Sequence, residues 1–220
     1  MKRPFLARSA LTTLALLMAL ACASVLVGGA QAAGVAPAGA TKQWYLRDLN
    51  STGAPNASFT YGLPGDIPIV GDWNGDGLDT PGVVRGNTWY LRNSNSIGVA
   101  NLTFTYGLPG DIPIVGDWNG DGLDTPGVVR GNIWYLRNSN STGVANLTFS
   151  YGLASDTKIV GDWNGDGIDT PGVVRGNAWY LRNSNSTGTN NIFFYYGLAS
   201  DAKLVGDWNG DFFDTPGVSR

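Results

Sequence analysis

Several residue types that enzymes and metal sites commonly use are missing from this 220-residue sequence. It has no histidine, and all 17 acidic residues are aspartate, so glutamate is absent too. The single cysteine, Cys22, lies in an apolar N-terminal stretch. Beyond that stretch no imidazole or thiolate is available for catalysis or for binding zinc, and no cysteine is available for a disulfide. These absences favour a non-catalytic protein.

The N-terminal stretch predicts a signal peptide over residues 1–32. Three basic residues lie within 1–8, an apolar and small-residue segment follows, and Ala30-Gln31-Ala32 fits the A-x-A pattern of a cleavage site. A membrane anchor is one alternative, and a lipoprotein that uses Cys22 as acceptor is another. We expect an exported, extracellular protein with no membrane segment in its mature form, and a flexible linker over 33–40.

Basic residues are scarce in the remaining chain. The whole sequence has 14 Lys and Arg and a net charge of −3, and loss of 1–32 leaves 11 basic against 17 acidic residues, a charge of −6. An acidic chain without a basic run is a poor partner for nucleic acid.

What the sequence does contain is a repeat with a period of 45 residues. The string GDW begins at 71, 116, 161 and 206, and WYLR begins at 44, 89, 134 and 179. The segment 41–220 therefore divides into four repeats: 41–85, 86–130, 131–175 and 176–220.

Each period predicts four short strands. In the interior of the chain these are 112–118, 126–130, 133–137 and 147–152, and Gly131-Asn132 suits a type II′ turn between the second and third. No helical apolar periodicity follows residue 40, so we expect an all-β fold.

Four strands in about 45 residues are typical of a β-propeller blade. Apolar residues occupy both faces of such a sheet, and stacking against copies of itself would bury both. The first repeat begins with the third and fourth strands, and the last repeat ends with the first and second, so these halves are expected to form one shared blade that closes a four-bladed ring. The alternatives are a fragment of a longer array and an open stack that oligomerises; we expect a monomer or a dimer.

The loop after GDW concentrates oxygen-bearing side chains. Counted from Asp72, positions 1, 3 and 5 are Asp72, Asn74 and Asp76, a glycine follows, and the carbonyl of Leu78 is at position 7. Such a loop can wrap a hard cation, and calcium accepts six to eight oxygens with irregular geometry. Position 12 is Val83 rather than the glutamate of an EF-hand, and magnesium is the second choice. The alternative is that Asn-Gly-Asp-Gly is ordinary turn chemistry.

The recurring G-D-W-N-G-D-G-x-D-T-P-G-V resembles the FG-GAP/VCBS-type repeats of integrin-alpha-like β-propellers found in exported bacterial proteins. The resemblance covers 41–220. It implies a calcium-binding hairpin loop in each blade and a role in adhesion or ligand recognition. Carried over to this sequence, the implied ligands are Asp72, Asn74, Asp76, Leu78, Asp117, Asn119, Asp121, Leu123, Asp162, Asn164, Asp166 and Ile168, where Leu and Ile contribute carbonyls.

Two departures from that pattern stand out. The family places its last aspartate at position 9, whereas here Thr80 and its equivalents occupy position 9. Either the aspartate at position 8 serves as a ligand, or it caps the loop through hydrogen bonds; these residues are Asp79, Asp124, Asp169 and Asp214. The last loop also has Phe212 where glycine is needed, so its residues form the weakest expected site: Asp207, Asn209, Asp211 and Asp214.

Three other features of the sequence are candidate functional sites. Paired aspartates could serve an Asp-dependent hydrolase, but they recur identically in every repeat, whereas an active site is one asymmetric constellation. Trp89, Tyr90 and Arg92 could stack a sugar, although packing between blades is favoured. The loops at 93–98, 138–143 and 183–188 are exposed binding candidates. The sequence thus predicts a calcium-binding module for an extracellular protein or glycan; the alternatives are a tandem-repeat lectin and an accessory part of a polysaccharide- or cell-wall-acting system.

Overall fold

The computed structural model describes residues 41–49 and 51–220, so the predicted signal peptide and linker lie outside it. The described residues form sixteen strands and no helix, which confirms the all-β prediction. The strands are β1 Gln43–Leu46, β2 Ala57–Thr60, β3 Ile67–Gly71, β4 Thr80–Arg85, β5 Thr88–Leu91, β6 Leu102–Thr105, β7 Ile112–Gly116, β8 Thr125–Arg130, β9 Ile133–Leu136, β10 Leu147–Ser150, β11 Thr157–Gly161, β12 Thr170–Arg175, β13 Ala178–Leu181, β14 Ile192–Tyr195, β15 Ala202–Gly206 and β16 Thr215–Ser219.

Three antiparallel sheets contain four strands each, in chain order: β3–β6, β7–β10 and β11–β14. The register is the same in all three; for example, Val128 pairs with Tyr135 as Val83 pairs with Tyr90. The predicted strands are therefore correct in order and differ at their ends by a few residues. The two remaining sheets, β1–β2 and β15–β16, have two strands each.

The second and third strands of each complete sheet are joined by a two-residue turn. Gly131 has φ 64°, and within the described chain Phe212 is the one non-glycine residue with positive φ, so Asn132 has negative φ. This combination is that of a type II′ turn, as the sequence predicts. The turn matches the twist of β8 and β9 and holds their register.

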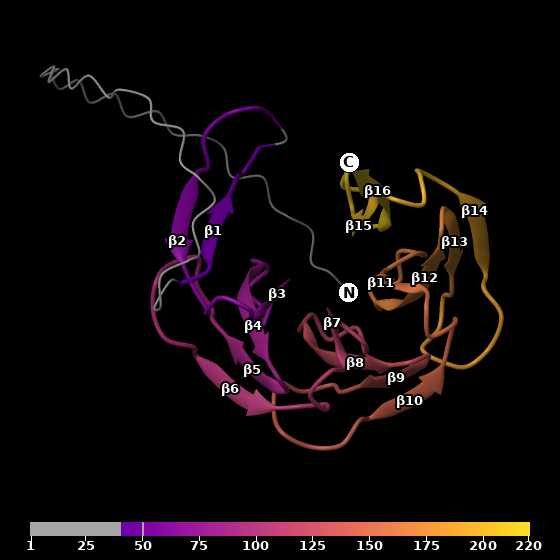
Figure 1. Cartoon of the computed structure of the whole chain (residues 1–220), viewed down its shortest axis with the longest axis horizontal. Helices are drawn as coiled ribbons and strands as arrows, with labels where there is room; N and C mark the ends of the chain where they lie inside the picture. The colour runs from indigo at the N-terminus through magenta and orange to yellow at the C-terminus, as the bar shows by residue number, and fades with distance from the viewer. Residues whose placement is uncertain (1–40, 50) are drawn as a thin grey trace, which may run out of the picture.

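The five sheets are arranged in an arc around a common centre (Figure 1). The innermost strands are the ones that precede the aspartate-rich loops, namely β3, β7, β11 and β15. Consecutive inner strands contact one another: β3 with β7, β7 with β11, and β11 with β15. Each sheet therefore meets its neighbour face to face. This places the loops of equivalent repeats at the same end of the assembly.

The core lies between successive sheets. The indoles of Trp89, Trp134 and Trp179 have no exposed surface, and Trp134 stacks on Phe149 with ring centroids 6.1 Å apart. The cluster around Trp89 also includes Val128 from β8 of the next sheet. Both faces of an interior sheet are thus covered, which is the burial that the apolar pattern requires.

The two-stranded sheets at the ends of the arc do not pair with each other, so the predicted shared blade is not formed here. The interior four-stranded sheets connect their second and third strands through a tight turn, whereas β16 and β1 are far apart in the sequence and have no such link. Side chains equivalent to buried ones are exposed as a result: Trp208 is 53% exposed and Trp118 is 3% exposed.

Replacing Trp134 with alanine should lower the free energy of unfolding by about 3–5 kcal/mol, because the side chain is fully enclosed between sheets. Trp44 is the equivalent residue of the partly exposed sheet β1–β2. Trp44→Ala should therefore cost clearly less. Urea denaturation of both variants measures the difference, and equal losses would contradict this account of the core.

Candidate functional site

The four aspartate-rich loops connect the first and second strands of each period. They lie between β3 and β4, β7 and β8, β11 and β12, and β15 and β16. This is the hairpin position that the sequence analysis expects. The side chains of positions 1, 3 and 5 lie within the same loop and form hydrogen bonds there. In the second, third and fourth loops, the aspartate at position 8 is instead hydrogen-bonded to the loop of the preceding repeat.

The carboxylate of Asp72 lies inside its own loop and accepts backbone hydrogen bonds. Its Oδ1 accepts the N–H groups of Gly75 at 2.7 Å and Asp76 at 3.2 Å, and its Oδ2 accepts that of Gly77 at 2.7 Å. The loops of Asp117, Asp162 and Asp207 repeat the pattern. The crowding of negative charge is therefore offset locally by oriented N–H dipoles.

The second carboxylate of the loop is also hydrogen-bonded. Asp76 accepts the N–H of Leu78 at 3.0 Å with Oδ1 and the Nδ2 of Asn74 at 2.9 Å with Oδ2. In the last loop, burial opposes ionisation of Asp207, but the N–H donors of Phe212, Gly210 and Asn209 outweigh it and lower its pKa. These contacts are those of the turn-chemistry alternative.

A calcium ion remains compatible with the donor chemistry of these loops. The side-chain ligand atoms that positions 1, 3 and 5 offer are oxygens, which calcium prefers, and an ionised carboxylate has about four lone-pair positions in total, of which the hydrogen bonds of Asp76 occupy two. Within residues 41–49 and 51–220, however, no three His, Cys, Asp or Glu side chains are gathered around one point as metal ligands. Calcium binding therefore stays a prediction.

The aspartate at position 8 connects one repeat to the preceding one. Oδ2 of Asp124 accepts the N–H of Asp72 at 2.8 Å, and the N–H of Asp124 donates to the carbonyl of Asp72 at 2.9 Å. Asp169 and Asp214 make the same pair of bonds to Asp117 and Asp162. For these three residues the structure matches the hydrogen-bonding alternative, except that the partner is the neighbouring loop.

Glycine before the first loop aspartate makes this contact possible. A Cβ on Gly71 would lie 2.9 Å from Oδ2 of Asp124, inside van der Waals contact. Because the indole of Trp73 also lies 2.9 Å from this Cβ position, the first residue of the GDW string is explained by close approach of both the next repeat and its own tryptophan.

Phe212 has φ 71°, whereas glycines with φ near 84° occupy this position in the first two loops. Its N–H nevertheless donates to Oδ2 of Asp207 at 3.0 Å, as Gly77 does to Asp72. The hydrogen-bonding pattern is therefore strong enough to hold a bulky residue in the left-handed region, as the sequence analysis expects for a strained last loop.

The polar loops after WYLR are organised by its arginine. Arg92 donates from Nε to the carbonyl of Ser96 at 2.7 Å and from Nη1 to that of Val99 at 2.7 Å. Arg137 and Arg182 repeat these contacts. Because Arg92 is engaged in this way and Trp89 is fully buried, the packing interpretation of WYLR is the one that the structure supports.

The polar loops and the aspartate loops lie at the same end of each sheet. Nδ2 of Asn140 donates to the carbonyl of Asp124 at 2.9 Å, and Asn185 does the same to Asp169. Thr142 also reaches the preceding sheet, where its Oγ1 accepts the N–H of Thr105 at 3.1 Å. The two candidate binding loops of one sheet therefore form one connected surface.

Four ion pairs, each between a buried aspartate and a partly exposed arginine, have no role in the sequence analysis. Asp111 is 4% exposed and accepts the guanidinium of Arg130 with both oxygens, the shorter bond being 2.7 Å. This hydrogen bond outweighs burial and lowers the pKa of Asp111. The others are Asp66–Arg85, Asp156–Arg175 and Asp201–Arg220. The 19-residue spacing of Asp and Arg in every repeat is the signal that could have found them.

No family model, curated protein or solved structure matches this chain. The resemblance to FG-GAP/VCBS-type repeats accordingly stays an interpretation of the loop sequence. The described residues also include no helix long and apolar enough to cross a membrane.

Replacing Phe212 with glycine should stabilise the protein by up to about 1 kcal/mol, because relief of the left-handed strain exceeds the entropy that glycine adds to the unfolded chain. The mirror variant is Gly122→Phe, since φ at Gly122 is 84° and no atom lies within 4 Å of its would-be Cβ. It should destabilise the protein by a similar amount. Thermal melting measures both; stabilisation by each variant would contradict the strain argument.

Proposed function

We propose that this chain is a secreted, non-catalytic β-propeller whose aspartate loops bind calcium and whose repeated loop surface acts as an adhesion or ligand-binding module. The observation that carries the proposal is the joining of the two loop types at one end of each sheet, through Asn140 and Asp124. A rigid scaffold that repeats such a surface suits recognition. The carboxylates recur identically from sheet to sheet, which also favours binding over catalysis.

Calcium would act on the same residues that already shape the loop. In each loop the side chains of positions 1, 3 and 5 supply the oxygens, and the ion would replace part of the N–H donation that offsets their charge. Because the neighbouring repeat is bonded to the backbone of position 1, ordering one loop also fixes the next sheet.

Thermal melting in millimolar calcium and in excess EDTA tests the calcium proposal. With an affinity on the order of 10⁻⁴–10⁻³ M, each site should contribute about 1 kcal/mol, and the melting temperature should rise by about 2–4 °C per site. Asp117→Asn should reduce the rise, and the exposed Asp48→Asn, with the same change in charge, should leave it intact. Identical melting in both solutions would refute calcium binding.

Closure of the ring is supported by the complementarity of the end sheets. By the register of β8 and β9, pairing of β16 with β1 would set Val218 opposite Tyr45, as Val128 is opposite Tyr135. Trp208 is 53% exposed and Tyr45 is 70% exposed, and joining the two half-sheets would give both the environment of their interior equivalents. Two unpaired strand edges with exposed aromatic residues favour association.

A disulfide between Val218→Cys and Tyr45→Cys tests closure, in a chain that also carries Cys22→Ser. Cross-strand neighbours have Cβ atoms close enough for a disulfide. A monomeric species with a disulfide indicates closure within one chain, whereas a disulfide-linked dimer indicates that two copies complete each other. Leu204→Cys with Tyr45→Cys is the control that should not cross-link. Absence of any disulfide in the first variant would count against the shared blade.

The two alternatives from the sequence remain distinguishable. A tandem-repeat lectin would bind simple sugars on a glycan array, and an accessory module would bind a cell-wall or storage polysaccharide instead. The cavities between successive sheets favour the lectin.

A further inference from the structure

Two equivalent cavities lie between successive sheets. One, of about 200 Å³ and open to solvent, is lined by the segment after β6 and by residues of β8 and β9, including Tyr106, Leu108, Val128, Arg130 and Tyr135. The other, of about 300 Å³, is formed one repeat earlier by Tyr61, Leu63, Val83, Arg85 and Tyr90. Every one of these pairs is 45 residues apart, so the cavity is a property of the repeat.

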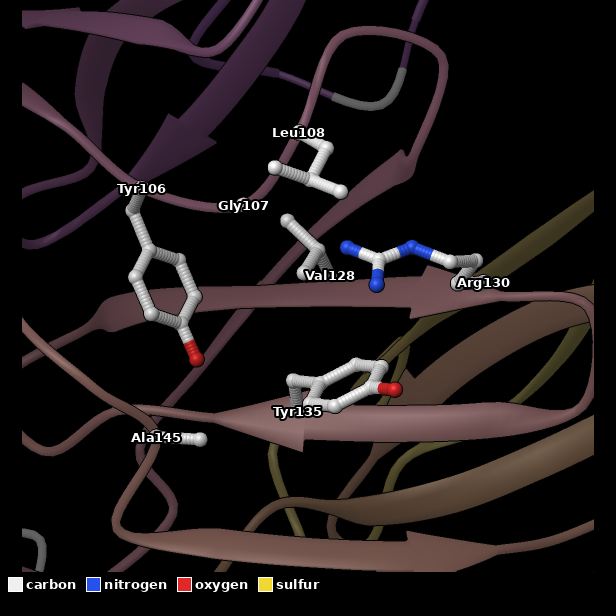
Figure 2. Close-up of a pocket in the computed structure, with 7 residues that line it drawn as sticks. All are labelled: Tyr106, Gly107, Leu108, Val128, Arg130, Tyr135 and Ala145. Carbon is white, nitrogen blue, oxygen red and sulfur yellow. The ribbon is translucent and has the colours of Figure 1, made fainter.

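Each cavity is lined by a tyrosine whose hydroxyl is buried and has no hydrogen-bond partner. Tyr106 is 5% exposed and Tyr61 is 6% exposed, and neither hydroxyl has a hydrogen-bond partner. In Figure 2 the hydroxyl of Tyr106 points toward the space between Tyr135 and Ala145. Burial raises the pKa of Tyr106 to about 12, so the group stays protonated at neutral pH and can both donate and accept. An unpartnered buried hydroxyl costs free energy unless a ligand satisfies it.

The charge of the cavity is already balanced. Arg130 uses Nε and Nη2 for Asp111, and its guanidinium lies 5.1 Å from the ring centroid of Tyr135. Neither bond to Asp111 involves Nη1, and the side chain is 46% exposed. The guanidinium therefore presents N–H donors to a ligand while its positive charge is compensated, which favours a neutral ligand over an anion.

The remaining wall is apolar. In Figure 2, Leu108 and Val128 lie on the side of the guanidinium, and Ala145 lies on the side of the Tyr106 hydroxyl. A small volume with an apolar wall and a few converging polar groups is suited to a ring-sized ligand, since cavities for drug-sized molecules begin at about 300 Å³.

We propose that each cavity binds one neutral sugar residue, with the tyrosine hydroxyl and the arginine N–H groups bonded to sugar hydroxyls and the apolar wall against the C–H face of the ring. The inference rests on the proposed function as a binding module and names its ligand class. At the third equivalent site Asn190 stands in place of Ala100 and Ala145, and its Nδ2 donates to the carbonyl of Ile192 at 3.3 Å. The chain should therefore have two matched sites and one altered site.

The experiment uses the full chain and a panel of neutral monosaccharides, with glucuronate as the anionic comparison. Saturation-transfer NMR identifies a binder, and calorimetry gives its affinity and stoichiometry. We expect a neutral member to bind at two matched sites per chain. Tyr61→Phe with Tyr106→Phe should weaken binding about tenfold, the effect of one lost hydrogen bond per site.

The same double variant separates a binding role from a structural one. A hydroxyl without a partner contributes nothing to folding, so the melting temperature of the free protein should stay unchanged or rise. Tyr195→Phe removes a hydroxyl from a side chain that is 68% exposed and should change neither binding nor stability.

Three results would overturn the sugar sites: no panel member binds, glucuronate binds better than every neutral sugar, or the double variant binds as well as the unaltered chain. Because calcium stabilisation and disulfide formation are measured without sugar, they report on the proposed scaffold separately. Calcium stabilisation without sugar binding would refute the sugar sites and retain the calcium-binding module. Sugar binding without a calcium effect would retain the sugar sites and refute calcium binding in the aspartate loops.

Discussion

The whole structure depends on one constraint: each four-stranded sheet is apolar on both faces and must be covered on both. Trp89, Trp134 and Trp179 show the solution, since each is fully enclosed by side chains that include those of a neighbouring sheet. A single repeat could not bury these residues alone, because two sides of one thin sheet cannot face the same interior. Stacking follows, and with it the contact between consecutive inner strands.

The aspartate loops add a polar coupling to this apolar stacking. Charge repulsion within a loop is offset by N–H groups that converge on Asp72, and the same residue is bonded through its backbone to Asp124 of the next repeat. Each loop is thus held by hydrogen bonds to its own N–H groups and by hydrogen bonds to the loop of the next repeat, so ordering one loop also positions the next sheet. This is why a single ion in such a loop would stabilise more than the loop itself.

Much of the fold could be predicted because it depends on residues that are close together in the sequence. Strand order, the Gly131-Asn132 turn and the strain at Phe212 all depend on residues close together in the sequence, and each is confirmed. The partner of Asp124, the orphaned hydroxyl of Tyr106 and the ion pair of Asp111 with Arg130 were not foreseen. Each of these depends on where a distant segment lies, and a repeat pattern does not state whether a side chain meets its own repeat or the neighbouring one.

The sequence alone determined the all-β class, the 45-residue period and the oxygen chemistry of the loops, because alternation, turn residues and side-chain type act within a few residues. Tertiary structure decided what these identical units do in different places. Trp118 is buried and Trp208 is exposed although both follow the same Gly-Asp, since Trp118 follows β7 of a four-stranded sheet and shares a buried cluster with Trp134, whereas Trp208 follows β15 of a two-stranded sheet. Identical repeats carry identical local information, so only packing distinguishes an interior sheet from an end.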